Sequence, residues 1–148
     1  MKHLKFEIDI MAPKEKVWDV LWNDETYRKW TSAFNEGSYA VSDWNEGSEI
    51  QFLGPGENGE GGMFSVIDKK VPAEFMSFKH LGVIKDGVAL PMDEETKQWT
   101  GAMENYHLSE RNDLTHLTVD LDTVESHADY FNDMFPKALQ IVKELSEK

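Results

Sequence analysis

The sequence predicts an α+β protein in which an antiparallel sheet packs against one long C-terminal helix. Three observations lead to this fold class. Residues 4–10 alternate between apolar and polar side chains, residues 38–122 alternate in the same way between short turns, and residues 126–148 repeat apolar side chains at helical spacing. Consecutive strands with short turns favour antiparallel pairing, and helices confined to the ends of the chain favour α+β. The length of 148 residues suits a single domain, 1–148.

The first elements are a strand and two short helices. The strand is expected at residues 4–10, where apolar side chains occupy every second position. Pro13 fits the first position of a helix that runs to about Trp22. A second short helix is expected to begin at Asn23 or Asp24.

Six further strands are predicted from alternating hydrophobicity between turn residues. They span residues 38–44, 48–53, 63–70, 75–81, 98–109 and 114–122. The glycine-rich segment 54–62 is interpreted as a hairpin loop, because it is acidic, has no Lys-Ser/Thr after its glycines and opens no helix. The polar segment 85–97 is interpreted as a long loop. With the first strand, this makes a sheet of about seven strands.

The C-terminal helix supplies the other half of the core. Ser126, followed by Asp129 three positions later, predicts its N-terminal cap. Its apolar face comprises Phe131, Met134, Phe135, Ala138, Val142 and Leu145. Pro136 lacks an N–H and crowds the preceding turn, so the helix is expected to kink near Phe135 or to restart at Pro136.

Charge and composition exclude several classes of function. The chain has 28 acidic and 15 basic residues, a net charge of −13, which disfavours nucleic acid and anionic membrane surfaces as partners. There is no cysteine, so disulfides, thiolate nucleophiles and cysteine-based zinc sites are impossible. No apolar stretch approaches the length of a membrane span or a signal-peptide core, and a cytoplasmic location is expected by default.

Three segments carry a resemblance to a known superfamily. They are IDIMAPKEKVWDVLWNDETYRKWTSAF (8–34), GGMFSVIDKKVPAEFMSFKHLG (61–82) and DYFNDMFPKALQIVKEL (129–145). Together they resemble SRPBCC (START-like) domains, in the branch named after the activator of the heat-shock-protein ATPase. The resemblance implies a helix-grip fold, in which a curved antiparallel sheet grasps the C-terminal helix around a ligand cavity. It does not select one chemistry, because the superfamily includes lipid carriers, hormone-binding proteins, cyclases, hydrolase-like members and co-chaperones.

The last two strands are expected to turn one carboxylate toward the interior. Leu117, Val119 and Leu121 should face inward, and pairing of Tyr106 with Leu117 turns Glu104 inward as well. A carboxylate there must be hydrogen-bonded, paired or protonated, because unpaired burial of its charge is very costly. A register shifted by one residue would instead place Glu104 in water.

A histidine is expected opposite this carboxylate. The apolar residues Met76 and Phe78 predict that His80 points inward on its strand, where it can meet Glu104. The two side chains can then bind a polar group of a ligand, act as acid and base, or form a purely structural pair.

Two other histidines raise the question of a metal. The same register places His107 opposite His116 on the outer face of the sheet. A third ligand is not evident, so both are interpreted as exposed sheet residues, and no metal or other cofactor is expected.

The expected function is non-catalytic binding of a small hydrophobic or amphipathic molecule between the sheet and the C-terminal helix. The candidate ligand-binding residues are Trp30, Phe34, Phe78, His80, Glu104, Tyr106, Phe131, Met134 and Phe135. No residue is assigned as catalytic. Three alternatives stay open: an enzyme that uses Glu104 and His80 as an acid–base pair, a chaperone-linked module with a protein partner, and a solid core that leaves no cavity.

Overall fold

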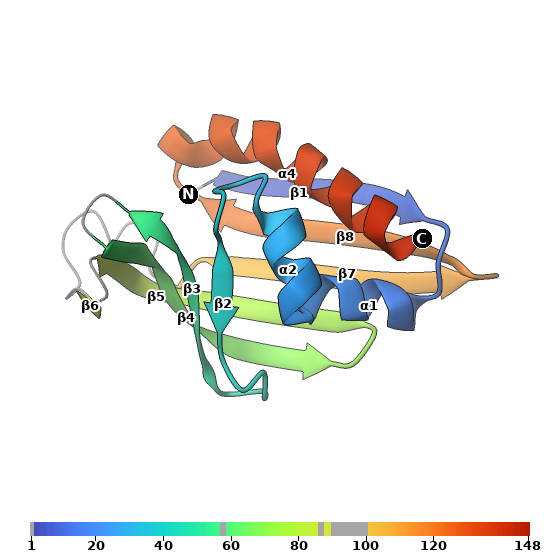
Figure 1. Cartoon of the computed structure of the whole chain (residues 1–148), viewed down its shortest axis with the longest axis horizontal. Helices are drawn as coiled ribbons and strands as arrows, with labels where there is room; N and C mark the ends of the chain where they lie inside the picture. Colours follow the sequence, from blue (N-terminus) through green and yellow to red (C-terminus); the bar gives the residue numbers. More distant parts are fainter. Residues whose placement is uncertain (1, 57–58, 86–87, 90–100) are drawn as a thin grey trace.

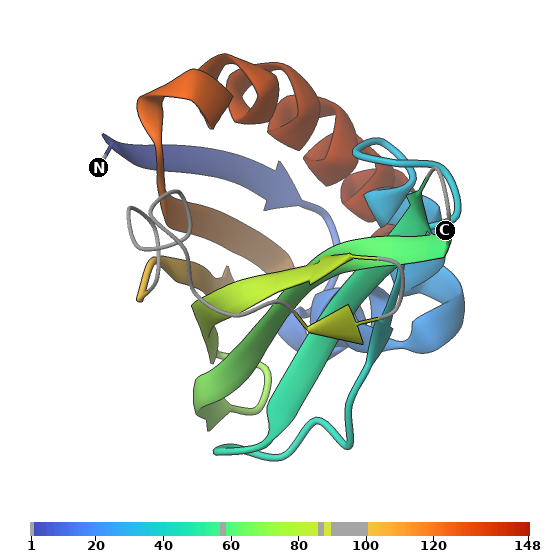
Figure 2. The ribbon, with the colours of Figure 1, turned by 90° about the vertical axis from the view of Figure 1, so that its left-hand side faces the viewer.

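The strands of the protein form one curved antiparallel sheet, which the C-terminal helix closes on one side (Figures 1 and 2). This computed structural model describes residues 2–56, 59–85, 88–89 and 101–148. The strands are β1 (Lys2–Ile10), β2 (Tyr39–Val41), β3 (Glu49–Gly56), β4 (Gly59–Val71), β5 (Phe75–Lys85), β6 (Val88–Ala89), β7 (Met103–Arg111) and β8 (Leu114–Thr123). Their order in the sheet is β1-β8-β7-β5-β4-β3-β2, and the short β6 pairs with β5. The predicted α+β fold class is therefore confirmed.

In the part of the chain that the structure describes, three helices cover the inner side of the sheet. They are α1 (Lys14–Trp22), α2 (Asp24–Thr31) and α4 (Glu125–Ser146). Helix α4 lies against β1 and contacts both short helices, which separate β1 from β2 in the sequence (Figure 1). None of the helices among the described residues is long and apolar enough to cross a membrane.

The core lies between α4 and the inner face of the sheet. On β8, Leu117, Val119 and Leu121 are buried, while the residues between them are partly exposed, as the alternating pattern predicts. On α4 the buried residues recur at helical spacing. They are Ala128, Phe135, Ala138, Leu139, Val142 and Ser146.

The beginning of α4 differs from the expectation. The helix starts at Glu125 after Val124, which makes no side-chain cap bond, so the prediction of Ser126 as the N-cap is wrong. The helix also continues through Pro136 as a single element, so it does not restart there. Pro136 is exposed, and the packing of the buried residues on either side of it holds the helix together despite the missing N–H.

The glycine-rich segment also differs from the expectation. It is not a simple loop: β3 extends to Gly56 and β4 begins at Gly59, and the two strands stay paired as far as Gly56 and Gly59. Glycines have no side chain to reveal alternation, so the pattern could not indicate these strand ends.

Two other predicted boundaries can be compared. Strand β2 covers only Tyr39–Val41 of the predicted 38–44, because the Ser42 hydroxyl accepts from the Trp44 N–H at 3.0 Å and Trp44 turns to φ 64°. The predicted strand 98–109 is observed from Met103, and its residues 98–100 lie outside the described part of the chain, as do residues 90–97 of the predicted loop.

Candidate functional site

Four polar side chains form a row of hydrogen bonds across β4, β5 and β7 on the inner face of the sheet. Ser65 Oγ lies 2.7 Å from His80 Nδ1, and His80 Nε2 lies 3.2 Å from Glu104 Oε1. The Tyr106 hydroxyl donates to Glu104 Oε2 at 2.6 Å. The structure thus turns His80 and Glu104 inward and brings them into contact.

The register of β7 and β8 differs from the one expected, but with no effect on which side chains face inward. Tyr106 pairs with Val119 and Glu104 with Leu121, whereas pairing of Tyr106 with Leu117 was predicted. The difference is two residues. Because side chains alternate with a period of two, such a shift leaves Glu104 on the inner face.

A cavity of about 600 Å³ lies beside this polar row, between the sheet and helices α2 and α4. Seven of the nine candidate ligand-binding residues line it: Trp30, Phe34, His80, Glu104, Tyr106, Phe131 and Phe135. Its volume falls within the range of roughly 300–1,000 Å³ that is usual for small-molecule sites.

The other two candidates lie elsewhere. Phe78 is fully buried, and its ring packs against Phe52 at 5.1 Å and Trp22 at 5.4 Å between ring centroids. Met134 is only partly buried on α4. Neither is among the residues that line the cavity. Phe78 faces inward as expected, but it sits in the aromatic core beside the cavity.

One end of the cavity is made by residues that the sequence pattern did not reveal. They lie where β3, β4 and β5 run side by side: Leu53, Gly54, Gly61, Gly62, Met63 and Val83. Leu81 has no partner between the pairs Ser65–His80 and Phe64–Gly82, which makes a β-bulge. The bulge puts His80 and Val83 on the same face although they are three residues apart. The cluster of glycines was the only feature of the sequence that could have indicated that another group approaches the backbone closely here.

Two tyrosine hydroxyls border the cavity near Glu104. Burial, and secondarily the negative charge of Glu104, raises the pKa of Tyr27 and of Tyr106 well above the usual range for a phenol. Both side chains therefore stay protonated at neutral pH, and Tyr106 can keep donating to Glu104.

Ser65, His80 and Glu104 contact one another in the same order as the members of a hydrolytic triad. A nucleophile must be accessible to substrate, however, and Ser65 is not. Ser65 is fully buried and does not line the cavity. Its hydroxyl contacts His80 Nδ1 at a buried position outside the cavity lining, so a substrate in the cavity does not meet it. The row holds His80 and Glu104 in place, and we assign Ser65 no reaction with a ligand.

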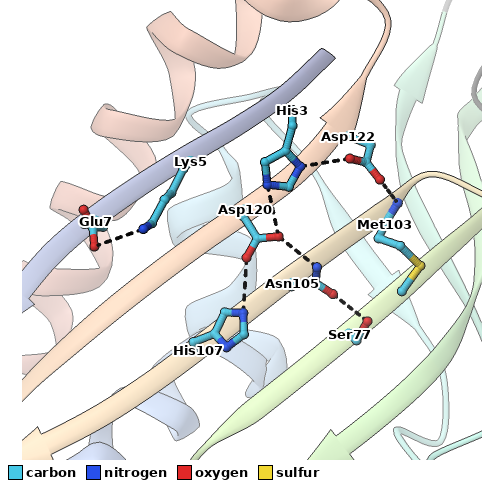
Figure 3. A network of polar contacts seen from close by, with 9 residues as sticks. All are labelled: His3, Lys5, Glu7, Ser77, Met103, Asn105, His107, Asp120 and Asp122. Atoms are coloured by element: carbon cyan, nitrogen blue, oxygen red, sulfur yellow. Dashed lines mark hydrogen bonds and ion pairs between the residues drawn. The ribbon is translucent and has the colours of Figure 1, made fainter. Parts of the chain in front are cut away.

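The outer face of the sheet carries a separate polar network (Figure 3). Asp120 accepts from Asn105 at 2.9 Å and contacts His107 at 3.2 Å, and His3 lies 2.9 Å from Asp122. These side chains alternate with the inward ones along β1, β7 and β8. They are therefore on the far side of the sheet from Glu104.

The predicted opposition of His107 and His116 is wrong. His107 pairs with Thr118, and His116 pairs with Ser109, because the register differs by two residues. Each histidine binds its own carboxylates. Within the part of the chain that the structure describes, no group of three potential ligands could hold a metal ion.

Stability should depend on pH through His116. Its Nδ1 lies 2.6 Å from Asp9 and its Nε2 lies 3.1 Å from Glu7, and these hydrogen bonds raise the pKa of His116 above 6.5. The contact with His116 is also the main cause that lowers the pKa of Glu7 below 4.5. Because folding raises the pKa of His116, this histidine stabilises the folded state fully at pH values below 6.5. The stabilisation is lost as the pH rises through the pKa of His116 in the folded state. Because folding lowers the pKa of Glu7, this carboxylate stabilises the folded state fully at pH values above 4.5. The stabilisation is lost as the pH falls through the pKa of Glu7 in the folded state.

We therefore expect His116→Gln to lower the free energy of unfolding more at pH 6 than at pH 9, as measured by urea titration. Asp9→Asn should show the same dependence on pH, because it removes the first of the two partners. Equal losses for His116→Gln at pH 6 and pH 9 would show that the ion pairs contribute nothing to stability.

Comparison with solved structures identifies the fold. The Aha1 dimer of Colwellia psychrerythraea superposes with a TM-score of 0.71 at 20% identity, covering 99% of this chain and 97% of that chain. ChR145 of Cytophaga hutchinsonii gives a TM-score of 0.70 at 20% identity, with 97% and 92% covered. The protein has the helix-grip fold. CalU16 of Micromonospora echinospora, at 15% identity and a TM-score of 0.67, shares this helix-grip fold over 97% of this chain and 75% of its own.

The helix-grip architecture that the sequence resemblance implies is thus present over nearly the whole chain. No family model and no curated protein matches the sequence. At these identities the helix-grip fold is what the solved structures share with this protein, so function has to be argued from its own cavity.

Proposed function

We propose that the protein binds a small hydrophobic or amphipathic molecule, without chemical conversion, in the cavity between the sheet and α4. The observation that carries this proposal is the cavity itself: about 600 Å³, walled mainly by aromatic and aliphatic side chains, with one polar row at its inner wall. An apolar hollow with a few convergent polar groups is the usual form of a ligand site. The apolar walls supply binding free energy, and the polar row orients one end of the ligand.

The contact between His80 and Glu104 also agrees with the alternative of acid–base catalysis, because 3.2 Å is within reach for proton transfer. However, both ring nitrogens of His80 are engaged, Nδ1 with Ser65 and Nε2 with Glu104. A ligand would have to displace Glu104 before it could exchange a proton with His80. This arrangement favours binding over catalysis.

Thermal unfolding with a neutral probe tests the proposal. We expect 2-(1-naphthyl)ethanol, at a hundred times its dissociation constant, to raise the melting temperature by roughly 5–10 °C, because it binds only the folded state. Val83→Trp should weaken this binding at least ten-fold, since the larger side chain would fill the end of the cavity.

Met11→Trp is the matched control, because Met11 is 70% exposed and does not line the cavity. It should leave the binding unchanged. Equal binding by the wild type, Val83→Trp and Met11→Trp would place the probe outside the cavity and contradict the proposal.

A further inference from the structure

The cavity wall is unusual in its charge. None of the described residues that line the cavity is lysine or arginine, whereas Glu104 and Asp122 both belong to the lining. The carboxylate of Asp122 accepts from the Met103 N–H at 3.1 Å and contacts His3 at 2.9 Å, both in the outer network (Figure 3). Glu104 is therefore the acidic group that the described part of the wall presents to the interior.

Glu104 still has capacity to accept hydrogen bonds. Each carboxylate has about four lone-pair positions over its two oxygens. Among the described residues, Oε1 contacts His80 and Oε2 accepts from Tyr106, and these two contacts use roughly half of these positions. The side chain is 20% exposed, so a molecule in the cavity can reach it. What the described wall lacks is a lysine or arginine cation, and what it offers beside Tyr106 is a carboxylate that accepts hydrogen bonds.

Aromatic residues line the same cavity as the acceptor. The rings of Tyr27 and Trp30 lie 5.3 Å apart, and those of Trp30 and Tyr106 lie 6.4 Å apart, all three lining the cavity. Phe34 and Phe131 continue this aromatic wall toward α4. Ring faces attract cations, most strongly in sites shielded from water. A carboxylate beside aromatic rings therefore suits an ammonium group and repels a second carboxylate.

From these observations we infer that the ligand is an amphipathic amine, whose ammonium group donates to Glu104 while its apolar body fills the aromatic cavity. This inference rests on the proposed function and specifies its ligand class. It excludes fatty acids and other carboxylate amphiphiles as good ligands. Neutral hydroxyl compounds should bind more weakly than amines and more tightly than carboxylates, because a hydroxyl can donate to Glu104 without bringing a charge.

Three probes with a shared naphthyl group test the inference by isothermal titration calorimetry at pH 7: 2-(1-naphthyl)ethylamine, 2-(1-naphthyl)ethanol and 1-naphthylacetic acid. We expect the amine to bind at least ten-fold more tightly than the acid. Glu104→Gln should weaken amine binding about ten-fold, leave the alcohol within about two-fold, and strengthen binding of the acid.

Because the protein has a net charge of −13, part of the preference for an amine could come from its overall field. Glu125→Gln is the matched control, since it makes the same change in charge at an exposed residue of α4 that does not line the cavity. The affinity of Glu125→Gln for the amine should stay within about two-fold of that of the wild type.

The outcomes separate the two proposals. The amine inference would be overturned if the alcohol bound but the amine and the acid bound equally well. It would also be overturned if Glu104→Gln left the affinity for the amine unchanged. Either result would leave the binding function standing. Failure of all three probes to bind would contradict the binding function and the amine inference with it.

Discussion

Phe135→Ala should lower the free energy of unfolding by about 3–4 kcal/mol, as expected for removal of a buried phenylalanine ring. Phe135 is 2% exposed in the middle of α4. Its ring stacks on Phe6 of β1 with centroids 5.0 Å apart and meets Phe34 edge-on at 4.8 Å. The substitution removes this aromatic contact between α4 and β1, and Phe135 also lines the cavity. Urea unfolding monitored by tryptophan fluorescence would measure the loss.

Met134→Ala is the matched control, because Met134 is the preceding residue on α4 and is only partly buried. We expect it to cost less than about 1 kcal/mol. If the two variants lost the same free energy, the contact of α4 with β1 through Phe135 would not be central to the core.

Gly62→Ala is the second large effect, with an expected loss of about 3 kcal/mol or more. Gly62 has a φ of +155°, and a Cβ atom there would lie 1.8 Å from the carbonyl oxygen of Phe52. The strands β3 and β4 would have to separate where they border the cavity. The loss should appear in urea unfolding as a lower midpoint with an unchanged slope.

Gly61→Ala provides the control in the same strand. The nearest atom to its added Cβ would be the Ile84 carbonyl oxygen at 3.4 Å, an ordinary contact. We expect a change within about 1 kcal/mol. A loss for Gly62→Ala no larger than that for Gly61→Ala would mean that the strands at this end of the cavity yield easily.

Much of the fold follows from local patterns in the sequence. The alternation along β1 and β8 predicted their buried sides, because one face of each strand is buried and the other is solvated. The inward orientation of Glu104 was predictable for the same reason. A shift in strand pairing by an even number of residues leaves the same side chains on the inner face. The predicted orientation of Glu104 is therefore correct although the predicted pairing of β7 with β8 was wrong by two residues.

The cavity end formed by β3, β4 and β5 was not predictable. The bulge at Leu81 interrupts the alternation of β5, so no regular pattern could indicate that Val83 joins His80 on the inner face. The glycines that line this end carry no hydrophobic signal at all. Phe78 illustrates the opposite case: the pattern showed that it faces inward, but only the packing of Trp22 and Phe52 around it decides that it lies beside the cavity.

The most direct test of the binding function is a two-dimensional ¹H–¹⁵N NMR titration of the labelled protein with 2-(1-naphthyl)ethanol. The account predicts that backbone amide shifts change at residues on the inner wall, such as Phe52, Ala102, Glu104 and Phe131. Amides of Lys5, Asn105 and His107, whose side chains lie on the outer face, should change much less (Figure 3). Changes concentrated on the outer face, or no saturable change at the inner wall, would contradict ligand binding between the sheet and α4.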